Sequence, residues 1–233
     1  MARINNKVGA TAKRFETSNE DLPMNIEMFR FLESSIKNSE EFKKLALIGK
    51  HKIYHQEENA LVHTHMVYKE AAVMFHDDYE MQLVALLHDI GKIYSSVQHG
   101  PDDWTYPNHA KAGAEHLDLF IPHIPEYEHI KWYIANHIRP LYWRTKEDLK
   151  EEFRYMNCPE GCSVIKLAQL ALCDIKGSVS LDPQTELKEY LEKFINEGTH
   201  ALKRASKYGL EKFALELINR GYSADEALDA WNL

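Results

Sequence analysis

The chain has 233 residues, of which 28 are Lys or Arg and 36 are Asp or Glu, so its formal net charge at pH 7 is −8. This charge argues against general coating of nucleic acid and against binding to anionic membrane surfaces. With 44% apolar and 27% charged residues, the composition is typical of a globular protein and excludes disorder throughout.

No apolar stretch is long enough to span a membrane, and residues 1–15 lack the apolar core of a signal peptide. The three cysteines, Cys158, Cys162 and Cys173, form an odd and sparse set that fits a reducing compartment. We therefore expect a cytoplasmic protein with no membrane contact. The CPEGC segment offers half of a zinc site as an alternative, but no second Cys/His pair follows at finger spacing.

Residues 1–22 are polar without an apolar period and are predicted to form a flexible N-terminal arm. From residue 23 onward, apolar residues follow helical spacing. Seven helices are expected, with apolar positions spanning residues 24–36, 42–48, 62–74, 83–90, 117–120, 130–134 and 164–171. Gly49 and Gly91 are expected to end the second and fourth, the fifth begins after Asn108, and Ser163 is the expected N-cap of the seventh.

Alternating segments of strand length are scarce, so the predicted fold class is all-α. Three further amphipathic stretches cover residues 187–195, 201–208 and 213–218, and Ser223 with Glu226 forms a capping-box pattern before a last short helix. We predict a main domain over residues 23–182 and a helical C-terminal extension over 183–233. The extension is expected to pack on the domain or to support a homo-oligomer.

Several histidines and aspartates fall on the predicted inward faces of different helices. His63 shares a face with Val67 and Ala71, His137 follows Ile130 and Ile134, and Asp174 follows Leu167 and Ala171. Burying even a neutral polar group without a partner costs on the order of 2–7 kcal/mol. A cation that also accepts imidazole ligands would compensate Asp174.

His88 and Asp89 stand side by side at the end of the fourth predicted helix, where both can reach one ion. Together with His63 and Asp174 they predict a four-ligand cage inside a helical bundle. Taken singly, an inward histidine is more often a hydrogen-bonded core residue, and an aspartate near a helix end is often a cap. The joint occurrence favours a metal site.

Five segments together carry a family resemblance. They are YHQEENALVHTHMV (54–67), LLHDIGK (86–92), NHAKAGAEHL (108–117), IANHIRP (134–140) and LAQLALCDIKG (167–177). Their order resembles the HD-domain superfamily of metal-dependent phosphohydrolases, and within it the HD domain of bacterial tRNA nucleotidyltransferases and related poly(A) polymerases. The resemblance implies a helical HD-domain bundle that hydrolyses phosphate esters or anhydrides.

Position by position, the resemblance places the ligands of one metal on His63, His88, Asp89 and Asp174, and those of a second metal on His109 and His137. Lys92 matches a lysine that faces the substrate phosphate, and His55 with Glu57 resembles a His-x-Glu element before the first ligand. Asp89 is the expected bridge between two ions. Lys92 and Arg139 are expected to neutralise charge on the phosphoryl oxygens, the alternative for each being a solvated surface cation.

Too few residues precede Tyr54 for a polymerase head, and no paired-aspartate site is evident, so we expect a stand-alone hydrolase domain. The mixed ligands favour one or two divalent transition metals, namely Mn, Fe, Co, Ni or Zn. The expected substrate is a nucleotide-type small molecule or an RNA end, cleaved at a phosphomonoester or a 2′,3′-cyclic phosphodiester. Hydrolysis of nucleoside or dinucleoside polyphosphates is the alternative enzymatic reading, and a non-catalytic binding module is the third.

Overall fold

The computed structural model describes residues 24–51, 53, 56–145 and 149–231. The predicted flexible arm therefore lies outside the described residues. The helices are α1 (Ile26–Asn38), α2 (Glu40–Lys43), α3 (Ala60–Met74), α4 (Tyr79–Leu87), α5 (Lys92–Ser95), α6 (His109–Glu115), α7 (Tyr127–Asn136), α8 (Leu149–Met156), α9 (Val164–Lys176), α10 (Thr185–Ser206), α11 (Glu211–Asn219) and α12 (Ala224–Asp229). Three short 3₁₀ helices, η1 (Lys44–Leu47), η2 (Leu117–Leu119) and η3 (Arg139–Thr145), and two strands, β1 (Val97–Gly100) and β2 (Asp103–Thr105), complete the described elements.

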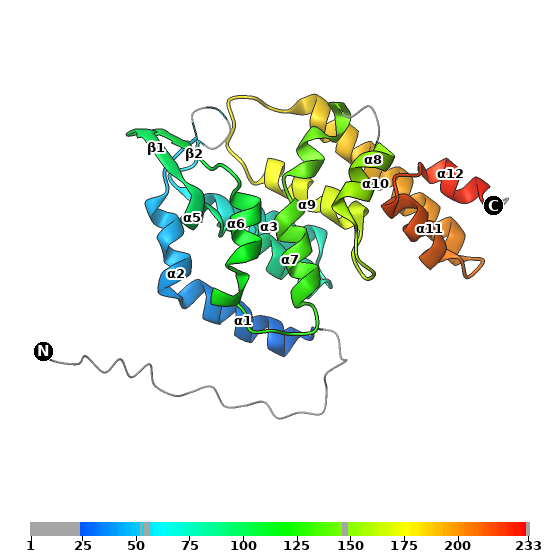
Figure 1. The fold of residues 1–233 in the computed structure, drawn as a ribbon, viewed down its shortest axis with the longest axis horizontal. Helices are drawn as coiled ribbons and strands as arrows, with labels where there is room; N and C mark the ends of the chain where they lie inside the picture. Colours follow the sequence, from blue (N-terminus) through cyan, green and yellow to red (C-terminus); the bar gives the residue numbers. More distant parts are fainter. Residues whose placement is uncertain (1–23, 52, 54–55, 146–148, 232–233) are drawn as a thin grey trace, which may run out of the picture.

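The helices form a bundle, which agrees with the all-α prediction (Figure 1). The helix α4 lies at its centre. Every residue from Met81 to Leu87 is buried, because this helix is apolar on nearly all sides and is covered by α1, α3, α7 and α9. The helix α3 packs on both α4 and α9, and α6 packs along α7. The ends of α4, α7 and α9 and the start of α6 therefore lie close together near the centre of the bundle.

Two glycines allow helices to approach closely near that place. A Cβ on Gly91 would lie 1.8 Å from the carbonyl oxygen of His109, and a Cβ on Gly177 would lie 2.6 Å from the backbone nitrogen of Val67. The first contact holds the start of α5 against α6, and the second holds the end of α9 against α3. Only glycine fits at these contacts without moving a helix.

The hairpin of β1 and β2 is the one β element among the described residues, and the sequence did not predict it. Its antiparallel register pairs Val97 with Thr105 and Gln98 with Trp104, around a turn at 101–102. The strands are three and four residues long and half or fully exposed, so they lack the alternating apolar pattern that identifies a strand. Trp104 donates its backbone N–H to the carbonyl of Lys50, which attaches the hairpin to the bundle.

The C-terminal segment differs from the prediction in its number of helices. The stretches predicted over 187–195 and 201–208 form one continuous helix, α10, in which Gly198 lies against Ile165 of α9. The glycine permits close packing and does not end the helix. The last helix begins at the predicted capping box, with Ser223 and Glu226 bonded reciprocally. The helices α8 and η3 were not predicted, and the boundary at residue 182 stays a prediction.

Among the helices that the structure describes, none is both long and apolar enough to cross a membrane.

Candidate metal centre

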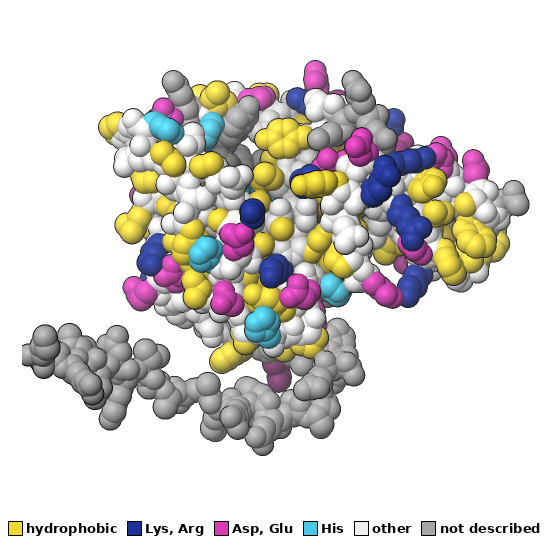
Figure 2. All heavy atoms as spheres, in the orientation of Figure 1, with side chains coloured by type: hydrophobic (Ala, Val, Ile, Leu, Met, Phe, Trp, Pro, Cys, Tyr) yellow, Lys and Arg dark blue, Asp and Glu magenta, His cyan; other side chains and the backbone are white. Residues whose placement is uncertain are grey.

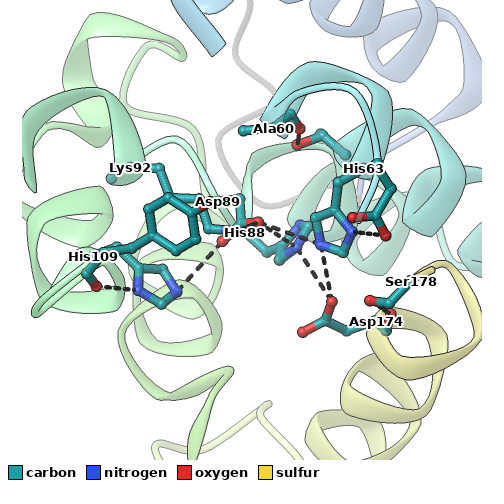
Figure 3. A network of polar contacts seen from close by, with 12 residues as sticks. Ala60, His63, His88, Asp89, Lys92, His109, Asp174 and Ser178 are labelled. Atoms are coloured by element: carbon teal, nitrogen blue, oxygen red, sulfur yellow. Dashed lines mark hydrogen bonds and ion pairs between the residues drawn. The ribbon is translucent and has the colours of Figure 1, made fainter. Parts of the chain in front are cut away.

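Five helix segments deliver the predicted ligands to one region of the bundle. Figure 3 shows His63 and Asp174 on one side of Asp89 and His109 on the other. His63 lies on the buried face of α3, and Asp174 projects from the last turns of α9. His88 and Asp89 directly follow α4, where the chain turns sharply into α5. The two remaining residues are His109, which begins α6, and His137, which follows α7.

The first group of potential ligands consists of His63, His88 and Asp89, all buried. Oδ2 of Asp89 lies 3.4 Å from His63 Nε2 and 3.3 Å from His88 Nε2. Asp174 extends this group, since its Oδ1 lies 3.0 Å from His63 Nε2. The structure thus brings together the four residues that the sequence assigned to one ion.

The second group consists of Asp89, His109 and His137. The other carboxylate oxygen of Asp89, Oδ1, lies 3.4 Å from His109 Nε2 and 3.8 Å from His137 Nε2. The two imidazole Nε2 atoms are 3.1 Å apart. Asp89 therefore presents one oxygen to each pair of histidines, which is the arrangement of a bridging carboxylate.

A second contact orients each histidine ring. Nδ1 of His63 faces the buried carboxylate of Glu57 at 3.5 Å. The other three rings each place Nδ1 against the backbone carbonyl three residues earlier, at 2.8 Å for His88 and Ala85, 2.8 Å for His109 and Tyr106, and 2.7 Å for His137 and Ile134. The carbonyl contacts fix Nδ1 as the protonated nitrogen of His88, His109 and His137 and leave the lone pair on Nε2, the form in which histidine binds a metal.

In this tautomer, the Nε2 lone pairs of the histidines repel one another and the nearby carboxylates unless a cation binds between them. The Nε2 lone pairs of His109 and His137 face each other at 3.1 Å, and neither nitrogen has a proton to donate. His88 Nε2 is buried and forms no hydrogen bond to a described residue, although a carboxylate oxygen lies 3.3 Å away. Buried acceptors that face only other acceptors lack compensation, and a divalent cation supplies it. The donor set therefore fits a metal.

The electrostatic environment keeps Asp89 ionised and His109 and His137 neutral, which are the forms that bind a cation. Burial opposes ionisation of Asp89, but the positive charge of Lys92 and the contact with His88 hold the pKa of Asp89 well below its usual range. Burial, together with the charges of His109 and His88, lowers the pKa of His137 to about 3. Burial also lowers the pKa of His109. Asp89 is therefore anionic at neutral pH, and these two histidines are neutral.

His63 and Asp174 form a different kind of pair. Burial disfavours the protonated imidazole, but hydrogen bonds to Asp174 and Glu57 outweigh it and raise the pKa of His63 to about 9. Burial likewise opposes ionisation of Asp174, whereas its hydrogen bond with His63 holds the pKa of the carboxyl below its usual range. Glu57 is the glutamate of the His-x-Glu element predicted from the sequence. The histidine of that element, His55, lies outside the described residues.

Lys92 lies at the floor of the site and is 2% exposed. Its Nζ is 2.6 Å from Asp89 Oδ2 and 4.4 Å from the ring centroid of Tyr106. Tyr106 also supplies the carbonyl that orients His109, and its hydroxyl donates to the carbonyl of Gly49. Tyr106 was missed in the sequence, because it follows an exposed hairpin and belongs to no apolar period.

Arg139 is the one predicted site residue that the structure places elsewhere. Its guanidinium pairs with Glu152 at 2.8 Å and lies 4.7 Å from the ring centroid of Tyr155. It lines a shallow pocket with Lys111 and Ala135 that contains none of the proposed ligands. A direct action on the substrate of the metal centre therefore has no support in this geometry.

A cavity of about 500 Å³ opens beside the centre and gives a substrate access to it. Asp89, Lys92, His109 and Asp174 lie at its inner end. Its walls come from η3 and from the chain between Ile175 and Leu187, so the start of the predicted extension contributes to it. Two described lining residues, Asn108 and Gln184, adopt left-handed backbone conformations with φ of 55° and 50°.

A larger cavity of about 800 Å³ lies between α8 and α11, far from these histidines in the fold. Figure 2 shows Lys and Arg side chains gathered at that end of the molecule, where Lys150, Arg154, Lys212 and Arg220 line it. Cys158 and Cys162 also line it, but neither belongs to a group of potential metal ligands among the described residues. The chemistry favours the smaller cavity as the functional one.

Comparison with protein-family models matches residues 61–169 to the HD domain. The matched segment contains His63, His88, Asp89, His109 and His137, and Asp174 follows it by five residues. Neither a search of curated proteins nor a search of solved structures found a match. The match supports the HD-domain superfamily, a class of helical, metal-dependent phosphohydrolases, and carries no evidence for the tRNA nucleotidyltransferase branch.

Proposed function

We propose that the chain is a metal-dependent phosphohydrolase that cleaves a phosphomonoester or a 2′,3′-cyclic phosphodiester of a nucleotide-type substrate. The observation that carries this proposal is the position of Asp89, whose two oxygens face two separate pairs of histidine Nε2 atoms. Many enzymes that hydrolyse phosphate esters bind two metal ions about 3.5–4 Å apart. The same cavity gives a substrate access to both groups of ligands.

The donor set favours a transition metal. Imidazole nitrogens mixed with carboxylate oxygens suit Mn²⁺, Fe²⁺, Co²⁺, Ni²⁺ or Zn²⁺, whereas Mg²⁺ and Ca²⁺ prefer oxygen ligands. When bound, such an ion lowers the pKa of water and withdraws charge from the phosphoryl oxygens. His63, His88, Asp89 and Asp174 would hold one ion, and Asp89, His109 and His137 a second.

The protein residues have separable tasks in this reaction. Asp89 holds both halves of the centre at a fixed separation, and the partners of the histidine Nδ1 atoms prevent the rings from rotating. Lys92 is already held beside Asp89, so its positive charge is available to the phosphoryl group without rearrangement. Water adds to phosphorus, the ester P–O bond breaks, and the released oxygen leaves as an alcohol after taking up a proton.

The cavity favours one nucleotide over a larger substrate. Its volume of about 500 Å³ accommodates a single nucleotide, and its wall includes apolar surface from Leu141 and Ile175. Tyr142 lines the cavity and is 58% exposed, so its ring is accessible to a base that stacks on it. Hydrolysis of a nucleoside or dinucleoside polyphosphate stays the second proposed function, and a binding module without activity is the third.

The decisive experiment combines metal and substrate. Purified protein is stripped of metal, reloaded separately with Mn²⁺, Co²⁺, Ni²⁺ and Zn²⁺, and assayed on a nucleoside monophosphate, a 2′,3′-cyclic nucleotide and a dinucleoside polyphosphate. With at least one metal, we expect either phosphate release from the first substrate or ring opening of the second to a nucleoside monophosphate. Asp89→Asn should lose about 10²-fold or more of this activity.

The matched control is Asp118→Asn, which removes one carboxylate from η2 outside the cavity. Its activity should equal that of the wild type. Tight binding of two ions without turnover of any substrate would favour the binding module. Activity that survives in Asp89→Asn would contradict the proposed centre.

A further inference from the structure

The cavity beside the metal centre contains cationic side chains at two depths. Among the described residues that line it, the Lys and Arg side chains are Lys92 and Arg144. Lys92 is 2% exposed and contacts Asp89, so it belongs to the reacting end. The side chain of Arg144, in η3, is 40% exposed and therefore lies toward solvent. The reaction proposed above gives Arg144 no task.

The present contact of Arg144 is weak and easily exchanged. Nη1 lies 3.3 Å from Oε2 of Glu186, a carboxylate whose side chain is 89% exposed. An ion pair this exposed is screened by water and contributes little to stability. A guanidinium has five N–H donors, which match the geometry of a phosphate group. Glu186 thus occupies a position in which an anion of the ligand could replace it.

The apolar part of the cavity wall is suited to an uncharged group. Ile138, Leu141, Ile175 and Leu187 contribute apolar surface to the cavity. Ile175 and Leu187 are buried, so this surface is part of the fixed core and does not depend on a mobile side chain. A nucleoside fits such a space, with its apolar faces against the wall.

Among the described residues that line the cavity, the acidic side chains have other partners than Arg144. Asp89 and Asp174 face the histidines of the metal centre. Asp182 lies on the cavity wall, where its Oδ1 accepts the backbone N–H of Gln184 at 3.0 Å in the turn before α10. Within the described part of this wall, Arg144 is therefore the cation that is available to a ligand.

We propose that the natural substrate carries a second phosphate group, one nucleoside away from the phosphate that is hydrolysed, and that Arg144 binds this second group in place of Glu186. The inference rests on the proposed function and specifies its substrate class. Water cleaves the ester at the metal end, so inorganic phosphate leaves and the second phosphate stays on the product. A free nucleoside 3′,5′-bisphosphate and the phosphorylated end of an oligonucleotide share this chemistry.

The test compares three substrates on the metal-loaded full chain. They are adenosine 5′-monophosphate, adenosine 3′,5′-bisphosphate and a 5′-phosphorylated dinucleotide. We expect kcat/KM for one of the two doubly charged substrates to exceed that for the monophosphate by roughly ten- to hundredfold. The bisphosphate and the dinucleotide distinguish the two sources of the second phosphate.

Variants then assign the preference to Arg144. In Arg144→Gln the ratio between the doubly and singly charged substrates should fall toward one, and Arg144→Lys should retain part of it because an ammonium cannot form the planar double contact. Glu186→Gln should lower KM for the preferred substrate, since the competing carboxylate is removed. Lys193→Gln, which removes an exposed cation of α10 outside the cavity, should leave the ratio unchanged.

Calorimetric binding of the bisphosphate to metal-stripped protein separates this proposal from the proposed function. Binding that weakens about tenfold or more in Arg144→Gln, without turnover on metal loading, would support the Arg144 site and contradict the hydrolase. Turnover with an unchanged substrate ratio in Arg144→Gln would overturn the Arg144 site and leave the hydrolase intact. Preference of the wild type for the monophosphate, or no binding of the bisphosphate, would also overturn it.

Discussion

At the level of single residues, the chemistry of the centre depends on histidines whose Nδ1 atoms are already committed. Three of the four rings use the carbonyl three residues earlier. His88 and His137 directly follow a helix, where the last carbonyls lack helical partners, whereas His109 begins α6 and uses the carbonyl of Tyr106, which precedes that helix. The rings of His109 and His137 are therefore oriented independently of His63 and His88. Each metal position should be removable separately.

His109→Ala is expected to lose one of two bound ions and to keep the other, because His63, His88 and Asp174 do not contact His109. Metal content per chain, measured by elemental analysis after loading with Mn²⁺, checks this expectation. His116→Ala is the matched control, since His116 lies at the end of the same helix and stacks on Tyr94 outside the centre. One ion per chain in wild type and in His109→Ala would rule out the binuclear site.

Glu80 is a partly buried carboxyl outside the centre, and its shifted pKa predicts a pH dependence of stability. Burial raises the pKa of Glu80 to about 7, whereas Lys166 lowers it and the charges of Asp78 and Glu126 raise it further. His129 faces the same carboxyl at 3.5 Å. A folded-state pKa above the unfolded value means that ionisation disfavours the fold. The resulting penalty is absent below about pH 4.5 and grows until about pH 7.

Glu80→Gln cannot ionise and should therefore stabilise the protein at pH 8, by on the order of 2 kcal/mol, with much less effect at pH 5. Urea unfolding of wild type and variant at the two pH values measures the difference. Glu189→Gln on the exposed side of α10 is the matched control and should show no such pH-dependent gain. Equal effects of Glu80→Gln at both pH values would contradict the assignment.

At the level of elements, the centre depends on helices that approach one another without side chains between them. The Cβ of an alanine at position 91 would lie 1.8 Å from the His109 carbonyl oxygen and 2.4 Å from the Gly113 nitrogen. The backbone of Gly91 has φ of −64°, which alanine adopts readily, so the obstacle is packing alone. The start of α6, and with it His109, would have to move.

Gly91→Ala is expected to lower the free energy of unfolding by about 1–3 kcal/mol and to weaken the second metal position more than the first. Chemical denaturation of stripped protein and metal titration of refolded protein measure the two effects. Gly100→Ala provides the control, because its Cβ would meet only Asp103 Cβ at an ordinary 3.9 Å. Equal unfolding energies for the two variants would show that the helices can separate without cost.

At the level of the whole molecule, the proposed ions would connect α3, α4, α6, α7 and α9, which are far apart in the sequence. An ion that binds only the folded state stabilises it by about 2.7 kcal/mol when its free concentration is a hundred times its Kd. For a chain of this length we expect chelation to lower Tm by about 5–10 °C. Differential scanning calorimetry with and without chelator measures the shift, and added Mn²⁺ should reverse it.

An unchanged Tm after elemental analysis has verified metal removal would contradict a centre that holds the bundle together. His99→Ala, in the exposed strand β1, is a suitable control because it should keep the full response to chelator. Gln184 and Leu187, at the start of α10, also line the cavity, so the beginning of the predicted extension lies beside the centre.

The sequence by itself determined the helical class and the inward positions of His63, His137 and Asp174, because helical periodicity fixes which residues share a face. The sequence also indicated that His88 and Asp89 can reach one ion, because they are adjacent at the end of a predicted helix. Asp89 was the expected bridge, but periodicity cannot show how far apart two helices lie. Which oxygen of Asp89 faces which histidine pair was therefore decided only by tertiary packing. The same limit hid Tyr106 and the hairpin, which follow no apolar period.

Tertiary structure also decided which cations lie at the cavity. Lys92 and Arg139 both follow ligand motifs, yet the turn after α4 directs Lys92 inward, whereas Arg139 pairs with Glu152. Arg144 carried no signal in the sequence, since an exposed arginine in a short 3₁₀ helix resembles any surface cation. Its position at the cavity depends on α10 packing against η3, a contact between segments that local patterns do not relate. Local patterns thus identified the groups with chemistry, and packing determined which of them meet.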